Sequence, residues 1–174
     1  MGRFELQFDI ADIPAYAARY ADEDDDEVLS IGRAARDRGY YTRDEFVAVC
    51  RWKTPRSGPL VATNSNNEVE AATRDALDDD SSQRERIDAL RSLAGVEFPT
   101  ASVLLHLADP DRYPILDKRT LHALGVRSPV SYSQRLWAQY VEEYRRLVAN
   151  ARVDGRTLDR ALWQWSKEQD TSPH

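Results

Sequence analysis

Two short clusters of basic residues have the composition of a surface that contacts phosphate. The first lies at the end of a predicted helix and in the turn that follows it, and its members are Arg51, Trp52, Lys53 and Arg56. Arg and Lys side chains contact phosphates while an indole stacks on a base, which is how single-stranded or flipped nucleotides are held. The alternative is structural, because cations at a helix C-terminus stabilise the helix dipole and Trp52 can be a core residue.

The second cluster is Lys118 and Arg119, which directly follow Asp117. Two bases at the start of a helix can meet a phosphate, or they can be solvated surface residues. Asp117 is placed to cap the short helix predicted for 118–124, because its carboxylate can accept a hydrogen bond from a free backbone N–H group. Capping explains the position of Asp117 on local grounds and is compatible with a chemical role.

Gly95 separates two predicted helices and provides a third possible phosphate contact. A glycine turn ahead of a helix exposes backbone N–H groups. The positive end of the helix dipole then binds a phosphate without any basic side chain.

The stretch from Leu93 to Gly125 resembles, in order and spacing, part of the helix-hairpin-helix DNA glycosylases, the endonuclease-III-like superfamily. The hairpin of that family is matched by Leu93, Gly95, Val96, Thr100 and Ala101. Its acid segment is matched by Pro114, Asp117, Leu121, Leu124 and Gly125. The resemblance covers about a fifth of the chain. It implies that Gly95, Val96 and Thr100 bind phosphate. It also implies that Asp117 is catalytic, staying ionised beside the glycosidic bond to stabilise an oxocarbenium-like sugar.

Two residues depart from the family pattern. Glu97 replaces the second glycine of the hairpin, which puts a carboxylate where a phosphate would approach and counts against duplex binding through this turn. Pro99 stands where the bifunctional members carry a Schiff-base lysine, so the resemblance implies an enzyme without lyase activity. The 51–57 and 161–167 stretches, together with the 113–117 run, are also similar to a set of small uncharacterised bacterial proteins.

These observations predict a nucleic-acid-acting protein, with DNA as the favoured partner. The first hypothesis is a monofunctional DNA glycosylase-like hydrolase of DNA repair, which removes a modified or damaged base with Asp117 catalytic. The alternative is a non-catalytic module on the same scaffold that binds nucleic acid or a protein partner. The residues leave the substrate base and the choice between DNA and RNA open.

Charge and composition narrow these possibilities. The net charge of −6 opposes nucleic-acid binding, but nine of the 30 acids lie in the runs 22–27 and 78–80, and the rest of the chain holds 21 acids against 24 bases.

One cysteine and three scattered histidines exclude disulfides, cysteine-rich zinc sites and iron–sulfur clusters, so we expect no metal and no cofactor. No apolar run could span a membrane and no export signal is visible, which predicts a cytoplasmic location.

Helical periodicity and capping signals dominate the sequence, and its length of 174 residues predicts one domain spanning 1–174. Thr42 with Glu45 and Ser82 with Glu85 are predicted capping boxes. We also expect Asp12 and Asn67 to cap helices and Gly125 to end one. We expect a loop from Thr54 to Asn67, rich in Pro, Gly and Asn. The predicted helices are 13–21, 27–38, 44–53, 68–77, 84–93, 99–107, 118–124, 133–150 and 157–168. The predicted fold is an all-α orthogonal bundle of about eight or nine helices that contains a helix-hairpin-helix-like element.

Overall fold

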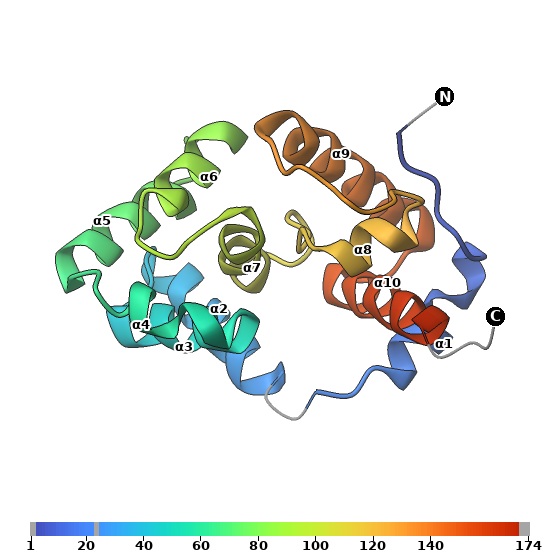
Figure 1. Ribbon diagram of the computed structural model, residues 1–174, viewed down its shortest axis with the longest axis horizontal. Coiled ribbons are helices and arrows are strands. Elements are labelled where there is room, and N and C mark those ends of the chain that lie inside the picture. The colour runs from blue at the N-terminus through green and yellow to red at the C-terminus, as the bar shows by residue number, and fades with distance from the viewer. Residues whose placement is uncertain (1–2, 23–24, 171–174) are drawn as a thin grey trace. The chain divides into compact units, whose positions relative to one another are not determined.

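The computed structural model describes residues 3–22 and 25–170, and within these it contains helices and no strand (Figure 1). The predicted all-α class is therefore confirmed for the described chain. Two 3₁₀ helices, η1 (Ile10–Asp12) and η2 (Pro55–Ser57), accompany ten α-helices. The α-helices are α1 (Ile13–Arg19), α2 (Asp25–Arg38), α3 (Arg43–Lys53), α4 (Gly58–Val61), α5 (Asn66–Leu77), α6 (Gln83–Arg91), α7 (Phe98–Ala108), α8 (Lys118–Ala123), α9 (Gln134–Ala151) and α10 (Gly155–Asp170).

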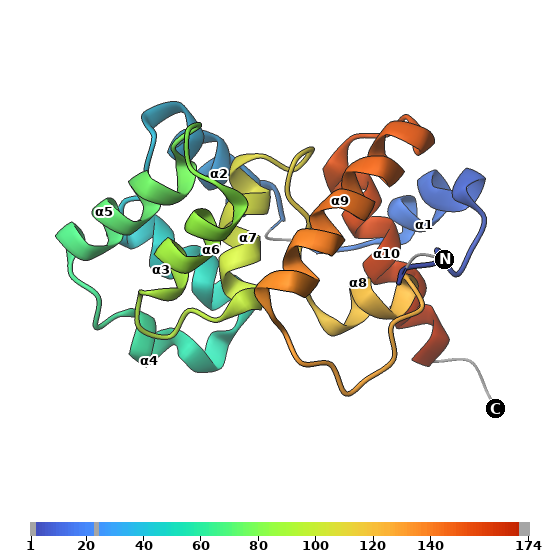
Figure 2. The ribbon, with the colours of Figure 1, turned by 90° about the horizontal axis from the view of Figure 1, so that it is seen from above.

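The described residues form two compact units. The first unit comprises the residues up to Asp22 together with those from Pro110 onwards, and the second comprises the residues between them, up to Asp109. In the first unit, α1 packs along α10, and α10 also packs against α8 (Figures 1 and 2). In the second, α7 packs against α2, α3 and α6. The expectation of one domain across 1–174 stays a prediction.

The capping signals fix most helix starts. Thr42 with Glu45 and Ser82 with Glu85 form the two predicted capping boxes, which open α3 and α6. The cap predicted at Asn67 was wrong, because Ser65 caps α5 through a third capping box with Glu68. Ser65 lies ahead of the predicted cap and has the reciprocal glutamate three positions on, a pair that satisfies two backbone N–H groups at once.

Two further local predictions were wrong. Asp12 makes no side-chain cap, because the chain is already helical in η1, and Asp9 supplies the cap there by accepting from the Ala11 N–H at 2.9 Å. The loop expected from Thr54 to Asn67 contains η2 and α4. Its prolines occupy first-turn positions of those helices, where a missing N–H costs nothing, so they start helices here instead of preventing them.

The core of the second unit is built around α7. The prediction of an apolar helix ending near Leu107 is confirmed, and every residue of α7 except Pro99 is buried. A Cβ at Gly32 would lie 2.1 Å from the Leu107 carbonyl oxygen, so only glycine allows α2 to approach this closely. Cys50 is fully buried, and burial raises the pKa of its thiol to about 12, which keeps it protonated and unreactive.

The core of the first unit is aromatic. Trp137, Tyr140 and Tyr144 of α9 are all fully buried. The Tyr144 hydroxyl lies 2.5 Å from the Pro110 carbonyl oxygen and 2.7 Å from that of Gly155, which joins the start of α10 to the loop before α8. The backbone of the N-terminal segment lies along the end of α8: the Glu5 and Gln7 N–H groups donate to the Leu124 and Ala123 carbonyls, both at 2.9 Å.

None of the helices in the described residues is both long and apolar enough to cross a membrane.

Candidate functional site

The glycine turn predicted ahead of α7 is present, and its parts are largely used in packing within the second unit. Gly95 has a φ of +80°, and a Cβ on it would meet the Val61 side chain at 2.8 Å. The side chains of Val96 and Thr100 are 2% and 4% exposed, and the Val96 N–H donates to the Leu93 carbonyl at 3.3 Å. Phosphate binding by Gly95, Val96 and Thr100 stays a prediction, and only backbone groups of this turn could provide it.

A side-chain amide holds this turn in place. Asn64 accepts from the Ala94 N–H at 2.9 Å, and its Nδ2 donates to the Ala94 and Val61 carbonyls at 3.0 and 2.8 Å. The Asn64 side chain thus pairs with both backbone groups of Ala94, as a neighbouring strand would. Its own backbone carbonyl accepts from Arg43 Nε at 2.9 Å, which ties the turn to α3.

Glu97 precedes α7 without capping it. Its side chain is 78% exposed and its Oε2 lies 3.2 Å from Arg91 Nη2, so the carboxylate reaches back to the end of α6. The Arg91 guanidinium also lies over the Phe98 ring, at 4.0 Å. A phosphate approaching the N-terminus of α7 would meet this carboxylate.

The first basic cluster lies at the C-terminal end of α3 and in η2, within the second unit. Arg51 and Arg56 are exposed, while Trp52 and Lys53 are half-buried. The Arg51 side chain covers Gly58, and a Cβ on that glycine would lie 3.2 Å from Arg51 Nε. The cluster is thus partly surface and partly packing, which leaves both interpretations of Trp52 open.

Asp117 caps α8, as the sequence predicts. Its Oδ1 accepts from the Thr120 N–H at 2.9 Å, and the Asp117 N–H donates to Thr120 Oγ1 at 3.3 Å. Thr120 is fully buried and its hydroxyl donates to the Ile115 carbonyl at 2.9 Å, so the residue that pairs with the Asp117 cap is itself held in place. Burial, and then the nearby Asp117 carboxylate, raise the pKa of Tyr132. Asp117 is half-buried, and its carboxylate already has a structural role as the cap of α8.

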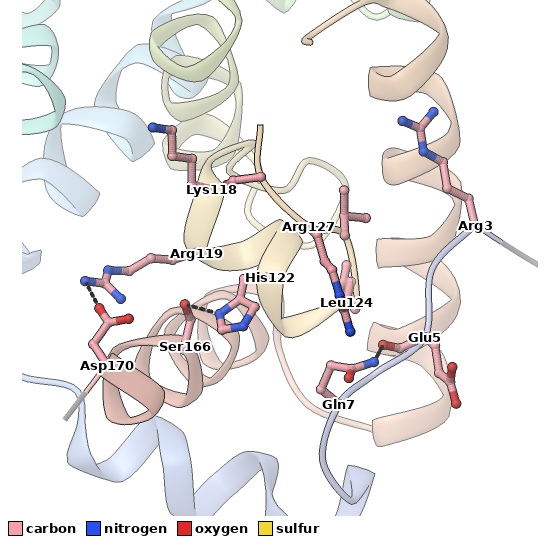
Figure 3. Close-up of a pocket in the computed structure, with 13 residues that line it drawn as sticks. Arg3, Glu5, Gln7, Lys118, Arg119, His122, Leu124, Arg127, Ser166 and Asp170 are labelled. Atoms are coloured by element: carbon pink, nitrogen blue, oxygen red, sulfur yellow. Dashed lines mark hydrogen bonds and ion pairs between the residues drawn. The ribbon is translucent and has the colours of Figure 1, made fainter. Parts of the chain in front are cut away.

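An open pocket of about 970 Å³ lies in the first unit, and four basic side chains are among the residues that line it (Figure 3). Two acids also line it, Glu5 and Asp170. Its bases are Arg3, Lys118, Arg119 and Arg127. We call it the cationic pocket. Four bases against two acids give it a local excess of positive charge in a chain whose net charge is −6.

Three segments bring these residues together. Helix α8 supplies Lys118 and Arg119 in its first turn, and Gly125, with a φ of +78°, ends it and turns the chain towards Arg127. A Cβ on Gly125 would lie 2.8 Å from Gln7 Nε2, so the glycine lets the N-terminal segment pass close by. That segment carries Arg3, whose Nη1 donates to Gln139 Oε1 at 3.4 Å.

Helix α10 closes one side of the cationic pocket. Arg119 Nη2 lies 2.8 Å from Asp170 Oδ2, and His122 Nδ1 lies 2.9 Å from the Ser166 hydroxyl (Figure 3). Arg119 is two-thirds buried on its side chain, whereas Lys118 and Arg127 are exposed. A ligand anion thus meets Lys118 and Arg127 as open charges and Arg119 as a charge already balanced by a carboxylate.

Lys118 and Arg119 line the cationic pocket together with Arg3 and Arg127, which sequence reasoning missed, and phosphate binding by Lys118 and Arg119 stays a prediction. Asp117 adjoins Lys118 in the chain but does not line the pocket in the described structure. No local signal marks Arg3, because its place depends on the N-terminal segment pairing with the end of α8. Arg127 follows a predicted helix-ending glycine by two residues, which is a weak signal. Among the described residues, no group of three or more His, Cys, Asp or Glu side chains is arranged to hold a metal ion.

Comparisons of the chain with protein-family models, with curated proteins and with solved structures find no match. Any conclusion about function therefore rests on the geometry and the charge of the site.

Proposed function

We propose that this protein binds nucleic acid, with DNA favoured, through the cationic pocket of the first unit. The observation that carries the proposal is the convergence of Arg3, Lys118 and Arg127 from separate segments on one pocket, beside Arg119. Lys and Arg side chains that neutralise phosphates supply most of the affinity of proteins for nucleic acid. A chain with net charge −6 lacks a general attraction for polyanions, so binding should depend on these few residues.

The test is the salt dependence of binding to fluorescein-labelled single-stranded and duplex oligonucleotides, followed by fluorescence anisotropy. Replacing both open charges, Lys118→Ala with Arg127→Ala, should weaken binding and lower the slope of log K against log salt by about two. The matched control is Arg51→Ala with Arg56→Ala, which removes the same charge from exposed positions of the second unit. Equal losses in the two double variants, or binding that salt leaves unchanged, would contradict the proposal.

A second candidate function is hydrolysis of an N-glycosidic bond by a monofunctional glycosylase-like mechanism. It is favoured by the position of Asp117, a half-buried carboxylate at the start of the helix whose first two residues line the cationic pocket. Such a carboxylate could stabilise positive charge on a sugar and orient water.

The test of this second function is incubation with duplexes that carry modified bases, followed by alkaline cleavage of abasic sites. Asp117→Asn keeps an oxygen that can cap α8 but removes the charge, so it should abolish strand breaks. Asp154→Asn is the matched control, because Asp154 caps α10 by accepting from the Thr157 N–H at 2.8 Å. Breaks that persist in Asp117→Asn would eliminate the catalytic role of this carboxylate, and absence of breaks with the wild-type protein would leave binding alone.

A further inference from the structure

Trp163 lies on the same face of α10 as two residues of the cationic pocket. Ser166 and Asp170 follow it by three and seven positions, and residues at this spacing share one side of an α-helix. Trp163 is half-buried, so part of the residue is open to solvent. A ligand in the pocket therefore has an aromatic surface about one helical turn away.

Cationic side chains cover the ring of Trp163. The Arg119 guanidinium lies 5.3 Å from the ring centroid and Lys167 Nζ lies 5.2 Å from it. Tyr20 packs edge-on against the same ring, with the centroids 5.4 Å apart. Arg119 also lines the pocket and pairs with Asp170. One arginine thus joins the aromatic surface to the charged one.

We propose that the ligand of this site is an unpaired nucleic-acid segment, with a phosphate in the cationic pocket and the adjoining base stacked on Trp163. The inference rests on the proposed function and names its substrate class. Stacking of a base on an aromatic ring is stronger than a cation–π contact at an exposed site, so a base can replace one of the cations on the ring. The cation that leaves the ring then stays beside the strand and can contact a phosphate, so its charge is not lost to binding.

The neighbouring tryptophan has a different role. The Trp165 ring stacks on Phe8, with the centroids 5.9 Å apart, and it also lies 5.1 Å from the His122 ring. These contacts join the N-terminal segment, α8 and α10, so Trp165 helps to build the wall of the pocket. Trp163 is flanked by Tyr20, by Arg119 and by Lys167, and of these Lys167 is exposed and can move aside.

The preference for single strands follows from whether a base has a free face on which Trp163 can stack. In a duplex both faces of each base are covered by its neighbours, so Trp163 can stack only on a base that is unpaired or extruded. A duplex could still place a phosphate in the pocket, but it would gain nothing from the ring. The site should therefore prefer single strands, and the preference should depend on the bases themselves.

The experiment compares a labelled oligothymidylate with an abasic phosphodiester strand of equal length, and with a duplex, by fluorescence anisotropy. The wild-type protein should bind the base-containing strand about ten-fold or more tightly than the abasic strand, the ratio expected for one stacked base. Trp163→Leu should remove that ratio while leaving the affinity for the abasic strand unchanged. Trp163→Tyr should restore most of it. An oligouridylate arm separates RNA from DNA as the source of the base and phosphate.

Tyr40→Leu is the matched control, because Tyr40 is also half-buried and has two arginines, Arg38 and Arg74, over its ring but lies in the second unit, and it should keep the full ratio. Equal wild-type affinity for the base-containing and abasic strands overturns the stacking inference and leaves phosphate binding standing. Tight duplex binding that equals the single-strand affinity also overturns it. Absence of binding to every strand overturns the proposed function itself. If Trp163→Leu fails to fold, the comparison of strands in the wild-type protein and in Trp163→Tyr still decides the matter.

Discussion

Each unit contains a turn at a glycine with positive φ beside a helix, and the two turns are used in opposite ways. Before α7, the backbone at Gly95 is covered by Val61 and the turn is held by Asn64. After α8, the main close neighbour of Gly125 is the Gln7 side chain, and both residues line the cationic pocket. The first turn is closed by packing, while the second borders an open surface.

A turn motif therefore identifies a backbone conformation and not an accessible surface. The stretch that resembles a phosphate-binding hairpin has its Val96 and Thr100 side chains buried and a carboxylate, Glu97, at the helix start. The stretch around α8 has no phosphate-binding hairpin but presents Lys118 and Arg127 to solvent. Which helix end can take a phosphate is decided by the segments packed around it.

The largest expected effect comes from adding a Cβ to each glycine. Gly95→Ala and Gly125→Ala share the strain of a positive φ, about 1–2 kcal/mol. At Gly95 the new atom also meets Val61 Cγ1 at 2.8 Å and the Val61 backbone nitrogen at 3.1 Å, whereas at Gly125 it meets the end of a flexible glutamine at 2.8 Å. Gly95→Ala should therefore lower the free energy of unfolding by about 2–4 kcal/mol and Gly125→Ala by about 1–2 kcal/mol.

Urea denaturation followed by circular dichroism measures both losses. Equal losses would contradict the view that only the first turn is closed by packing. Binding to an oligonucleotide should change in the Gly125 variant, because the new methyl group displaces Gln7 within the pocket, and should not change in the Gly95 variant.

A smaller effect is expected at the side chains that lie beside the two turns. Asn64→Ala removes three hydrogen bonds and leaves the backbone groups of Ala94 without this partner, which should cost about 2 kcal/mol. Gln7→Ala removes one exposed hydrogen bond, from Nε2 to the Glu5 carbonyl at 2.7 Å, and should change stability by about 0.5 kcal/mol or less. Thermal unfolding of the two variants compares their losses of stability. A loss of stability in Gln7→Ala as large as that in Asn64→Ala would mean that the two turns are equally fixed.

Much of the local structure was predictable from the sequence because its signals are local. The capping boxes at Thr42 and Ser82 and the cap at Asp117 each involve residues at most three positions apart, and all three are present. The segment from Pro55 to Val61 was missed because proline and glycine favour both turns and helix starts, and only packing separates the two outcomes.

The candidate site was only partly predictable, because two of its four basic residues, Arg3 and Arg127, lie outside α8. Lys118 and Arg119 could be found from their place behind a helix cap. Arg3 lies in a segment without periodicity, and its part in the pocket depends on backbone hydrogen bonds from Glu5 and Gln7 to the end of α8. Such a pairing of an extended segment with a helix end has no spacing rule that a sequence could reveal.

The smallest effect separates the two roles assigned to Asp117. If the residue only caps α8, Asp117→Ala should lower the free energy of unfolding by about 1 kcal/mol and Asp117→Asn by a few tenths, because asparagine caps about as well as aspartate. Asp154→Ala should give a loss of similar size, since Asp154 makes the corresponding bond to the Thr157 N–H at the start of α10. Catalysis also requires the negative charge of the Asp117 carboxylate, which a measurement of stability does not detect. A variant Asp117→Asn with full stability, normal oligonucleotide binding and no base removal would assign chemistry to the carboxylate, whereas full retention of every activity would show that the cap is its whole function.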